Sequence, residues 1–292
     1  MNDLRNETTR TRLFWMMLAI GFVLLAAIPG NAEPERTAWE PLFRGIEHAT
    51  GHATEPRLQA VNALRVDLHE PSIEFIATPS NGEDPGETLR RTGRRFVEEF
   101  EVQVAVNTHF IDIHANVGRN AVLHGVSVSQ GELVSELEDL PHGGASLLIT
   151  KDNEARFERT IPGFDLDGVW TALESWPLFI VDGQNLGDPT TRSIHPRTAI
   201  GLSEDKRYLI IITIDGRQPG YSEGATFQET AQWLIDFGAY EGMNLDGGGS
   251  THLWIDCPDE GPRPLNTPSE NRAVGSHLGI YAPPLESATD NQ

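Results

Sequence analysis

The stretch GMNLDGGGSTHLWI, residues 242–255, places Asp246, three consecutive glycines and two hydroxyl residues between two apolar segments. Three glycines together need a specific cause, because glycine loses more backbone freedom on folding than any other residue. The pattern predicts a strand, a glycine turn and a second strand. A plain hairpin needs only one or two glycines. The third therefore indicates a backbone that leaves room for something else, with N–H groups able to cradle an anion.

Working outward from this stretch, alternating or continuous apolar segments predict further strands. They span residues 58–68, 72–78, 102–107, 123–135, 145–150, 177–184, 197–203, 207–216 and 276–282. Two segments have helical periodicity: residues 85–101, and a helix that begins at Thr226 and stops near Gly238. Thr226 and Glu229 have the spacing of a capping box. Together these patterns predict an α+β fold: a single mixed, mostly antiparallel sheet domain with a few packed helices.

The N-terminal 32 residues differ in character from the rest of the chain. Three arginines precede an uncharged apolar run at 13–28, and the small residues Gly30 and Ala32 follow it. This order is typical of a secretory signal peptide. A retained membrane anchor is the alternative, although 16 residues are short for a span of about 20. Either interpretation predicts an exported protein, periplasmic or extracellular, that meets a membrane only through an uncleaved N-terminal segment.

The remainder of the chain divides by composition into a lead-in segment at 33–56, one domain at 57–282 and a C-terminal tail at 283–292. The formal net charge of −21 argues against a nucleic-acid partner, because phosphate contacts need clustered Lys and Arg. The single Cys257 cannot form an intrachain disulfide. Stability must therefore come from packing, or from a metal.

Several predicted strands end in polar corners, where a rigid sheet can aim side chains. The corners are Asn107–Phe110, His195–Thr198, Asp215–Arg217 and Asp246–Ser250. Two aspartates supply the carboxylate pair that glycoside cleavage commonly uses, and two arginines supply forked donors for a phosphate. Each corner also has a structural interpretation as a turn, a salt-bridged arginine or a buried histidine.

The same corners carry a resemblance to a known family. RTAIG at 197–201, DGRQPGYSEG at 215–224, GAYEGMNLDGGGST at 238–251 and NRAVGSHLGIY at 271–281 resemble the phosphodiester glycosidase family. VAVNTHFID, GVSVSQGELVS and SWPLFIVDGQ match three further blocks, so the resemblance covers most of 57–282. It implies a hydrolase that releases an N-acetylglucosamine-like sugar from a sugar-1-phosphodiester, exported and acting on surface or extracellular glycan such as exopolysaccharide.

The resemblance also implies site residues. The catalytic candidates are Asp246, Asp215 and, in reserve, Glu223; the substrate-binding candidates are Asn107, His109, Arg197, Arg217, Gly247, Gly248, Gly249 and Ser250. No cofactor and no metal site are expected, with a divalent ion on Asp215, Asp246 and a histidine left open.

Two departures from the family pattern add bulk beside the expected pocket. Thr108 and His109 replace paired glycines, and Ser175–Trp176–Pro177 replaces a glycine-glycine-proline block. A non-catalytic glycan- or phosphoglycan-binding module of the same fold is therefore the alternative function.

Overall fold

The structure, a computed structural model, describes residues 34–140, 144–257 and 260–285. The segment interpreted as a signal peptide or anchor lies outside these residues, as does most of the predicted C-terminal tail. Within the described ranges, no helix is long and apolar enough to cross a membrane.

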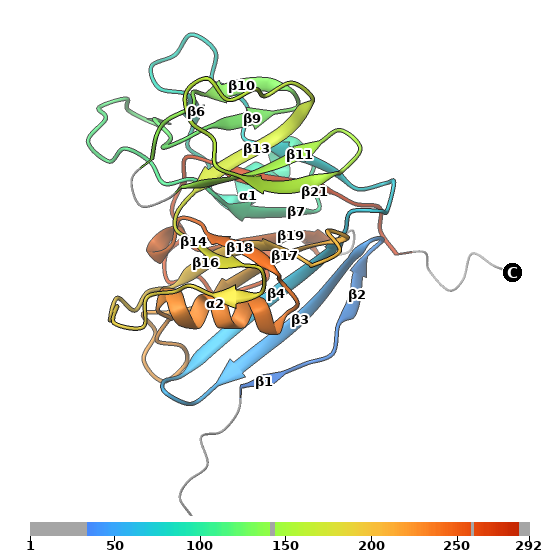
Figure 1. Cartoon of the computed structure of the whole chain (residues 1–292), viewed down its shortest axis with the longest axis vertical. Helices are drawn as coiled ribbons and strands as arrows, with labels where there is room; N and C mark the ends of the chain where they lie inside the picture. The colour runs from blue at the N-terminus through green and yellow to red at the C-terminus, as the bar shows by residue number, and fades with distance from the viewer. Residues whose placement is uncertain (1–33, 141–143, 258–259, 286–292) are drawn as a thin grey trace, which may run out of the picture. The chain divides into compact units, whose positions relative to one another are not determined.

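The largest element is a nine-stranded sheet, here called the large sheet (Figure 1). Its order is β1 (Glu35–Arg36), β3 (Ile46–Ala53), β4 (Gln59–Asp67), β17 (Tyr208–Ile214), β16 (Arg197–Leu202), β18 (Glu241–Asn244), β14 (Leu178–Val181) and β15 (Gln184–Asn185), with β2 (Glu40–Phe43) paired to β3. Neighbouring strands are antiparallel throughout.

Two five-stranded antiparallel sheets and a short ribbon complete the strand structure. The second sheet has the order β20 (Gly261–Pro264), β19 (Leu253–Cys257), β7 (Val104–Asn107), β21 (His277–Tyr281) and β5 (Glu74–Ala77). The third sheet has the order β10 (Glu132–Ser135), β9 (Ser127–Ser129), β13 (Val169–Ser175), β11 (Ala145–Thr150) and β12 (Ala155–Glu158). The ribbon pairs β6 (Thr88–Leu89) with β8 (Asn120–Ala121).

Two α-helices cover the outer faces of this arrangement. Helix α1 (Gly93–Phe100) packs on the second sheet, and helix α2 (Phe227–Asp236) packs on the large sheet. The predicted capping box is present in α2: the Thr226 side chain accepts from the Glu229 N–H, and the Glu229 side chain accepts from the Thr226 N–H. Each helix therefore buries its apolar stripe against one sheet.

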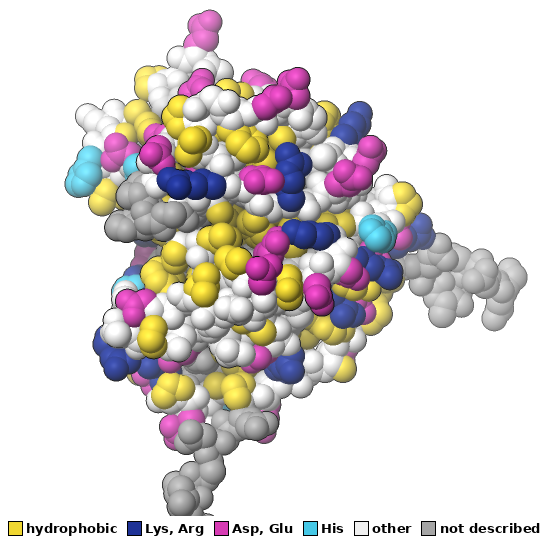
Figure 2. All heavy atoms as spheres, in the orientation of Figure 1, with side chains coloured by type: hydrophobic (Ala, Val, Ile, Leu, Met, Phe, Trp, Pro, Cys, Tyr) yellow, Lys and Arg dark blue, Asp and Glu magenta, His cyan; other side chains and the backbone are white. Residues whose placement is uncertain are grey.

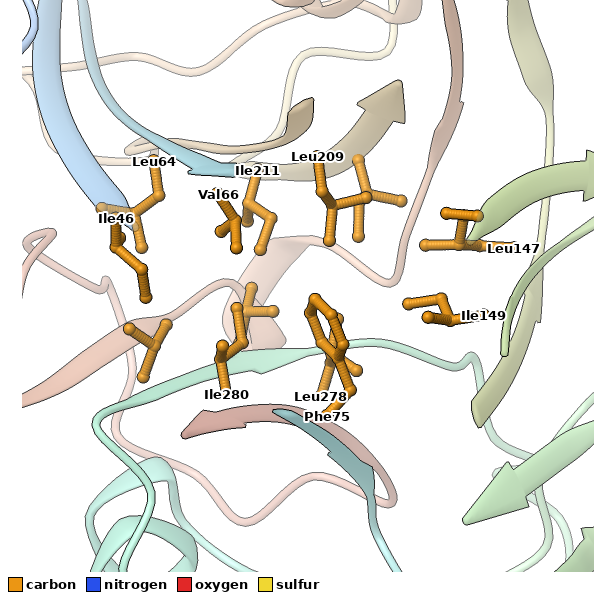
Figure 3. Packing of buried hydrophobic residues seen from close by; sticks show 14 of the residues in the cluster. Ile46, Leu64, Val66, Phe75, Leu147, Ile149, Leu209, Ile211, Leu278 and Ile280 are labelled. Atoms are coloured by element: carbon orange, nitrogen blue, oxygen red, sulfur yellow. The ribbon is translucent and has the colours of Figure 1, made fainter. Parts of the chain in front are cut away.

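The main core lies between the sheets rather than on one face of a single sheet. Figure 3 shows Leu64 and Ile211 of the large sheet facing Ile280 of the second sheet. Leu147 and Ile149 of the third sheet close the same cluster from the side. Its members are almost fully excluded from water, and such burial is the dominant favourable contribution to folding.

The opposite face of the large sheet packs against α2. Ile210, Ile212 and Ile214 alternate with the inward-facing residues of β17 and meet Trp233 and Leu234 of the helix. Both faces of β17 are thus buried, because successive side chains point to opposite faces of a strand. This explains why residues 208–214 form a continuous apolar run rather than an alternating one.

The predicted antiparallel pairing with a few packed helices is confirmed, but the single sheet is wrong. Strand periodicity shows that a segment is extended, whereas its partner is chosen by contacts distant in sequence. Residues 85–101 also contain β6 as well as α1, so the predicted helix was too long at its N-terminal end.

The segment 33–56 is not a lead-in: it supplies β1, β2 and β3 of the large sheet. Strand β3 keeps its polar side chains at partly or fully exposed positions and its smaller or apolar ones at buried positions. Because histidines and glutamate make this segment polar, the sequence did not predict the strand.

The glycine stretch is also not a hairpin. Strand β18 belongs to the large sheet and β19 to the second sheet, and a short 3₁₀ turn at Gly248–Ser250 joins them. The glycines therefore lie where the chain crosses from one sheet to the other.

Candidate active site

Three of the predicted corners meet at one end of the large sheet. Strand β16 pairs with both β17 and β18, with Arg197 opposite Ile214 and Ala199 opposite Asn244. The two flanking strands therefore run in the same direction and end beside the start of β16. The Asp215 and Asp246 corners follow these strand ends directly, as the sequence predicted.

Asp246 is partly buried and firmly held. Its backbone N–H donates to the Thr108 carbonyl at 2.8 Å, and its carbonyl accepts from the Asn107 side chain at 2.6 Å. Its carboxylate accepts from the Gly247 N–H at 2.8 Å. Burial raises the pKa of Asp246 to about 6, although the Ser250 hydroxyl, the Arg272 charge and the Gly247 N–H act in the opposite direction. A carboxyl in this range can exchange a proton near neutral pH.

Asp246 lines a cavity of about 220 Å³. The other lining residues are Arg90, Phe110, Ile111, Ile113, Ser250, Arg272, Ala273, Val274 and Gly275. Arg272 donates from Nη2 to the Ser250 hydroxyl at 2.6 Å. The cavity lining thus combines one aspartate, two arginines and one aromatic residue.

The three glycines, 247–249, are each closely approached by a different neighbour. A Cβ on the first would lie 2.8 Å from the Pro196 carbonyl oxygen, and one on the second 2.8 Å from Nη2 of Arg217. A Cβ on the third would lie 2.4 Å from the Glu270 carboxylate. The second glycine also has φ +63°, a conformation that other residues adopt at a cost. The triplet therefore keeps the turn free of side chains.

The glycine N–H groups are less available than the sequence suggested. The N–H of Gly247 donates to the Asp246 carboxylate, and that of Gly248 to the Pro196 carbonyl at 2.9 Å. The expectation of an anion cradle made of backbone N–H groups does not hold for these two residues. Cationic side chains surround the turn instead.

Two arginines lie around the glycine turn with a carboxylate between them. Arg217 Nη1 donates to Glu270 Oε1 at 3.4 Å, and Arg272 Nη1 lies 3.9 Å from Glu270 Oε2. Arg217 Nη2 is also 3.5 Å from Nδ1 of His195. Burial, with the positive charges of Arg197 and Arg217, lowers the pKa of His195. The site is locally cationic in a strongly acidic chain.

Asn107 and Arg197 lie behind the site as supports. The Asn107 side chain is completely buried; its oxygen accepts from the Thr198 hydroxyl at 2.8 Å and the His252 N–H at 3.1 Å. Arg197 donates from Nε to the Ala225 carbonyl at 2.9 Å and lies over the Phe227 ring. Burial lowers its pKa to about 10. Asn107 thus holds the carbonyl of Asp246, whereas Arg197 holds the chain at Ala225 and Ser193.

Asp215 is buried and acts as a clamp: its carboxylate holds a nearby loop through hydrogen bonds. Its Oδ1 accepts from Asn266 Nδ2 at 2.8 Å, and its Oδ2 accepts from the Thr267 N–H at 3.0 Å and the Tyr221 hydroxyl at 2.9 Å. Burial raises the pKa of Asp215, while these hydrogen bonds act in the opposite direction. The carboxylate fixes the start of the loop that carries Glu270 and Arg272.

His109 and Glu223 lie away from the cavity-lining set. The His109 ring is buried, and its Nε2 meets the Val126 carbonyl at 3.0 Å and the Glu174 N–H at 3.2 Å. Burial lowers the pKa of His109 to about 4, so the ring is neutral. Glu223 is exposed, and its backbone carbonyl accepts from the Arg217 N–H at 3.1 Å.

An aromatic cluster adjoins the cavity. The Phe110 and Trp176 rings are 4.3 Å apart, and the His124 ring is 5.9 Å from Trp176. Phe110 lines the cavity directly. Trp176 therefore supports one wall of the cavity through its contact with Phe110.

Glu270, Arg272 and Phe110 are not among the site residues predicted from the sequence. Arg272 and Phe110 lie inside blocks that carried the family resemblance, NRAVGSHLGIY and VAVNTHFID. Their membership in those blocks was the available signal. Glu270 lies in a polar loop whose position depends on the Asp215 clamp.

Within the described part of the chain, no group of three or more His, Cys, Asp or Glu side chains is arranged to hold a metal ion. On the face seen in Figure 2, basic side chains are interspersed with acidic ones.

Comparison with known proteins identifies a matching family. The family model for phosphodiester glycosidases matches residues 100–281. The chain therefore belongs to the phosphodiester glycosidase family. A search of curated proteins finds no match.

Three solved structures share the fold at low sequence identity. The catalytic domain of zebrafish N-acetylglucosamine-1-phosphodiester alpha-N-acetylglucosaminidase, auto-inhibited by its pro-peptide, is 19% identical with a TM-score of 0.62; the match covers 85% of this chain and 88% of that one. A hypothetical protein from Synechocystis is 14% identical with a TM-score of 0.59; the match covers 82% of this chain but only 62% of that one. A protein of Burkholderia pseudomallei K96243 named as exported is 15% identical with a TM-score of 0.57; the match covers 80% of this chain and 76% of that one.

Proposed function

We propose that this protein is a hydrolase that releases a sugar from a sugar-1-phosphodiester, with Asp246 as the proton-transferring carboxylate. The observation that carries the proposal is the position of Asp246: a partly buried carboxyl with a pKa of about 6 that lines a cavity together with Arg272. Membership of the phosphodiester glycosidase family supports the reaction class.

In the proposed reaction the anomeric C–O bond breaks and its electron pair remains on the phosphate oxygen. Water adds to the anomeric carbon, and the Asp246 carboxylate takes the proton that the water loses. The phosphomonoester leaves as an anion, so it needs little protonation, and nearby arginines stabilise its charge. The developing positive charge on the sugar favours an ionised carboxylate nearby.

The zebrafish relative's name supports an N-acetylglucosamine-like sugar as the first substrate to test. Phe110 lines the cavity and Trp176 packs against its ring, and aromatic rings present flat apolar surfaces against which a sugar face can pack. We propose that these rings contribute to the choice of sugar.

We further propose that the protein acts outside the cytoplasm on surface or extracellular glycan. The order of basic, apolar and small residues in 1–32 supports export, and so does the likeness to a Burkholderia protein named as exported.

The test is a screen of the purified domain against sugar-1-phosphodiesters that differ in the sugar, with released reducing sugar as the readout. We expect turnover with at least one sugar, and its loss in Asp246→Asn. Binding without turnover across the whole panel would favour the alternative, a glycan- or phosphoglycan-binding module.

A further inference from the structure

Glu270 occupies the space between the two arginines at the glycine turn. Its two carboxylate oxygens face different guanidinium groups, Oε1 at 3.4 Å from Arg217 and Oε2 at 3.9 Å from Arg272. The carboxylate also lies against Gly249, where a Cβ would come within 2.4 Å of it. A side chain at this position would push the carboxylate out of the place it occupies.

This arrangement can open without unfolding. The three side chains have exposed fractions of 43% for Arg217, 50% for Arg272 and 47% for Glu270. Ion pairs that are this exposed are individually weak. An external anion can therefore replace Glu270 while both guanidinium groups stay in place.

A carboxylate resembles a phosphodiester in its charge and shape. A carboxylate carries one negative charge on two oxygens, and a phosphodiester carries one negative charge on two non-bridging oxygens. Arginine forks match both groups. Arg272 also donates to Ser250, whose hydroxyl is hydrogen-bonded to Asp246. Arg272 therefore links the space that Glu270 occupies to Asp246 in the cavity.

We propose that Arg217 and Arg272 form an anion subsite for a phosphodiester, and that Glu270 fills this subsite in the free protein and is displaced by the ligand. The identity of the anion as the substrate's phosphodiester rests on the proposed function; the anion subsite itself rests only on the geometry. Glu270 is then an internal competitor that sets how strongly the site takes up phosphate.

Calorimetric titration of the purified protein with dimethyl phosphate, and separately with inorganic phosphate, tests the proposal. We expect Glu270→Gln to bind dimethyl phosphate about three- to tenfold more tightly than the unmodified protein, since two weak exposed ion pairs no longer compete. Arg272→Gln and Arg217→Gln should bind it more weakly. Glu98→Gln, which removes an exposed ion pair with Arg94 on α1, is the matched control and should bind as the unmodified protein does.

Equal or weaker dimethyl phosphate binding by Glu270→Gln would overturn the inference, even if the protein hydrolyses sugar-1-phosphodiesters. Tighter binding by Glu270→Gln without turnover of any sugar would support the subsite and count against the proposed function. Tightening for inorganic phosphate but not for dimethyl phosphate would overturn the assignment to a phosphodiester.

Discussion

Two strands of the large sheet are followed within two residues by the same dipeptide, Asp-Gly, and the two aspartates have different environments. Asp215 follows β17 and accepts hydrogen bonds from Tyr221, Asn266 and Thr267. Asp246 follows β18 and lines a cavity beside Arg272. Burial raises the pKa of both carboxyls. The same dipeptide after neighbouring strand ends therefore produces a clamp in one place and a candidate catalytic group in the other.

The difference arises from what packs over each corner. The loop at 266–267 closes on Asp215 and uses both its oxygens. Over Asp246 the chain instead turns through three glycines and leaves a cavity. Partner groups that satisfy a carboxylate make it structural, whereas an open, desolvated carboxylate retains the capacity for chemistry.

The largest expected effect is on turnover in Asp246→Asn. Removing the proton-transferring carboxyl should lower kcat for a sugar-1-phosphodiester by about 10³-fold, the usual scale for general acid–base catalysis. Released reducing sugar is the measurement. An unchanged kcat would mean that Asp246, like Asp215, is structural rather than catalytic.

Asp215→Asn should mainly affect stability. The amide cannot accept from all three partners of the carboxylate, and a buried donor left unpaired costs about 1–3 kcal/mol. Denaturant unfolding should show a loss of about 2 kcal/mol, with any fall in activity following the loss of folded protein. A variant of normal stability but no activity would place Asp215 in the chemistry after all.

The pH dependence of stability should also reflect the environment of Asp246. The folded-state pKa of Asp246 is about 6 against an ordinary value of 3.8, so the folded state binds more protons between these values. The free energy of unfolding should therefore fall as pH rises from about 4 to 6, by about 2 kcal/mol, and Asp246→Asn should lack this contribution. The measurement is the difference between the two proteins' unfolding curves across a pH range of about 4 to 8. Parallel pH profiles would contradict the environment assigned to Asp246.

The pH dependence of activity follows from the same pKa. If the carboxylate of Asp246 accepts a proton from water, kcat should decline as pH falls below about 6. A decline only above that pH would assign Asp246 as the proton donor instead.

The smallest expected effect is that of Gly248→Ala. The positive φ alone costs about 1 kcal/mol, and the methyl group would also displace the end of Arg217. Gly163→Ala is the matched control, because its φ is +95° and no atom lies within 4 Å of the added carbon. Both variants should lose similar stability, but only Gly248→Ala should lose activity. Equal activity in both would make the glycine turn purely structural.

The sequence by itself predicted much of the local structure. The capping box placed the start of α2 correctly, because Thr226 and Glu229 interact within one helical turn. The strands around 207–216 and 276–282 were predicted from their apolar runs, which local periodicity reveals. The polar corners after the strands were also predicted. The sequence blocks around them predicted the family to which the chain belongs.

Only the tertiary structure decided which strands pair and what each corner does. The strands at 35–53 and the division into several sheets depend on contacts far apart in sequence. The same applies to Glu270 and Arg272, which reach the glycine turn through a loop fixed by Asp215. A sequence specifies which groups are present at a strand end, but the exclusion of water and the partners that set a carboxyl's pKa come from packing.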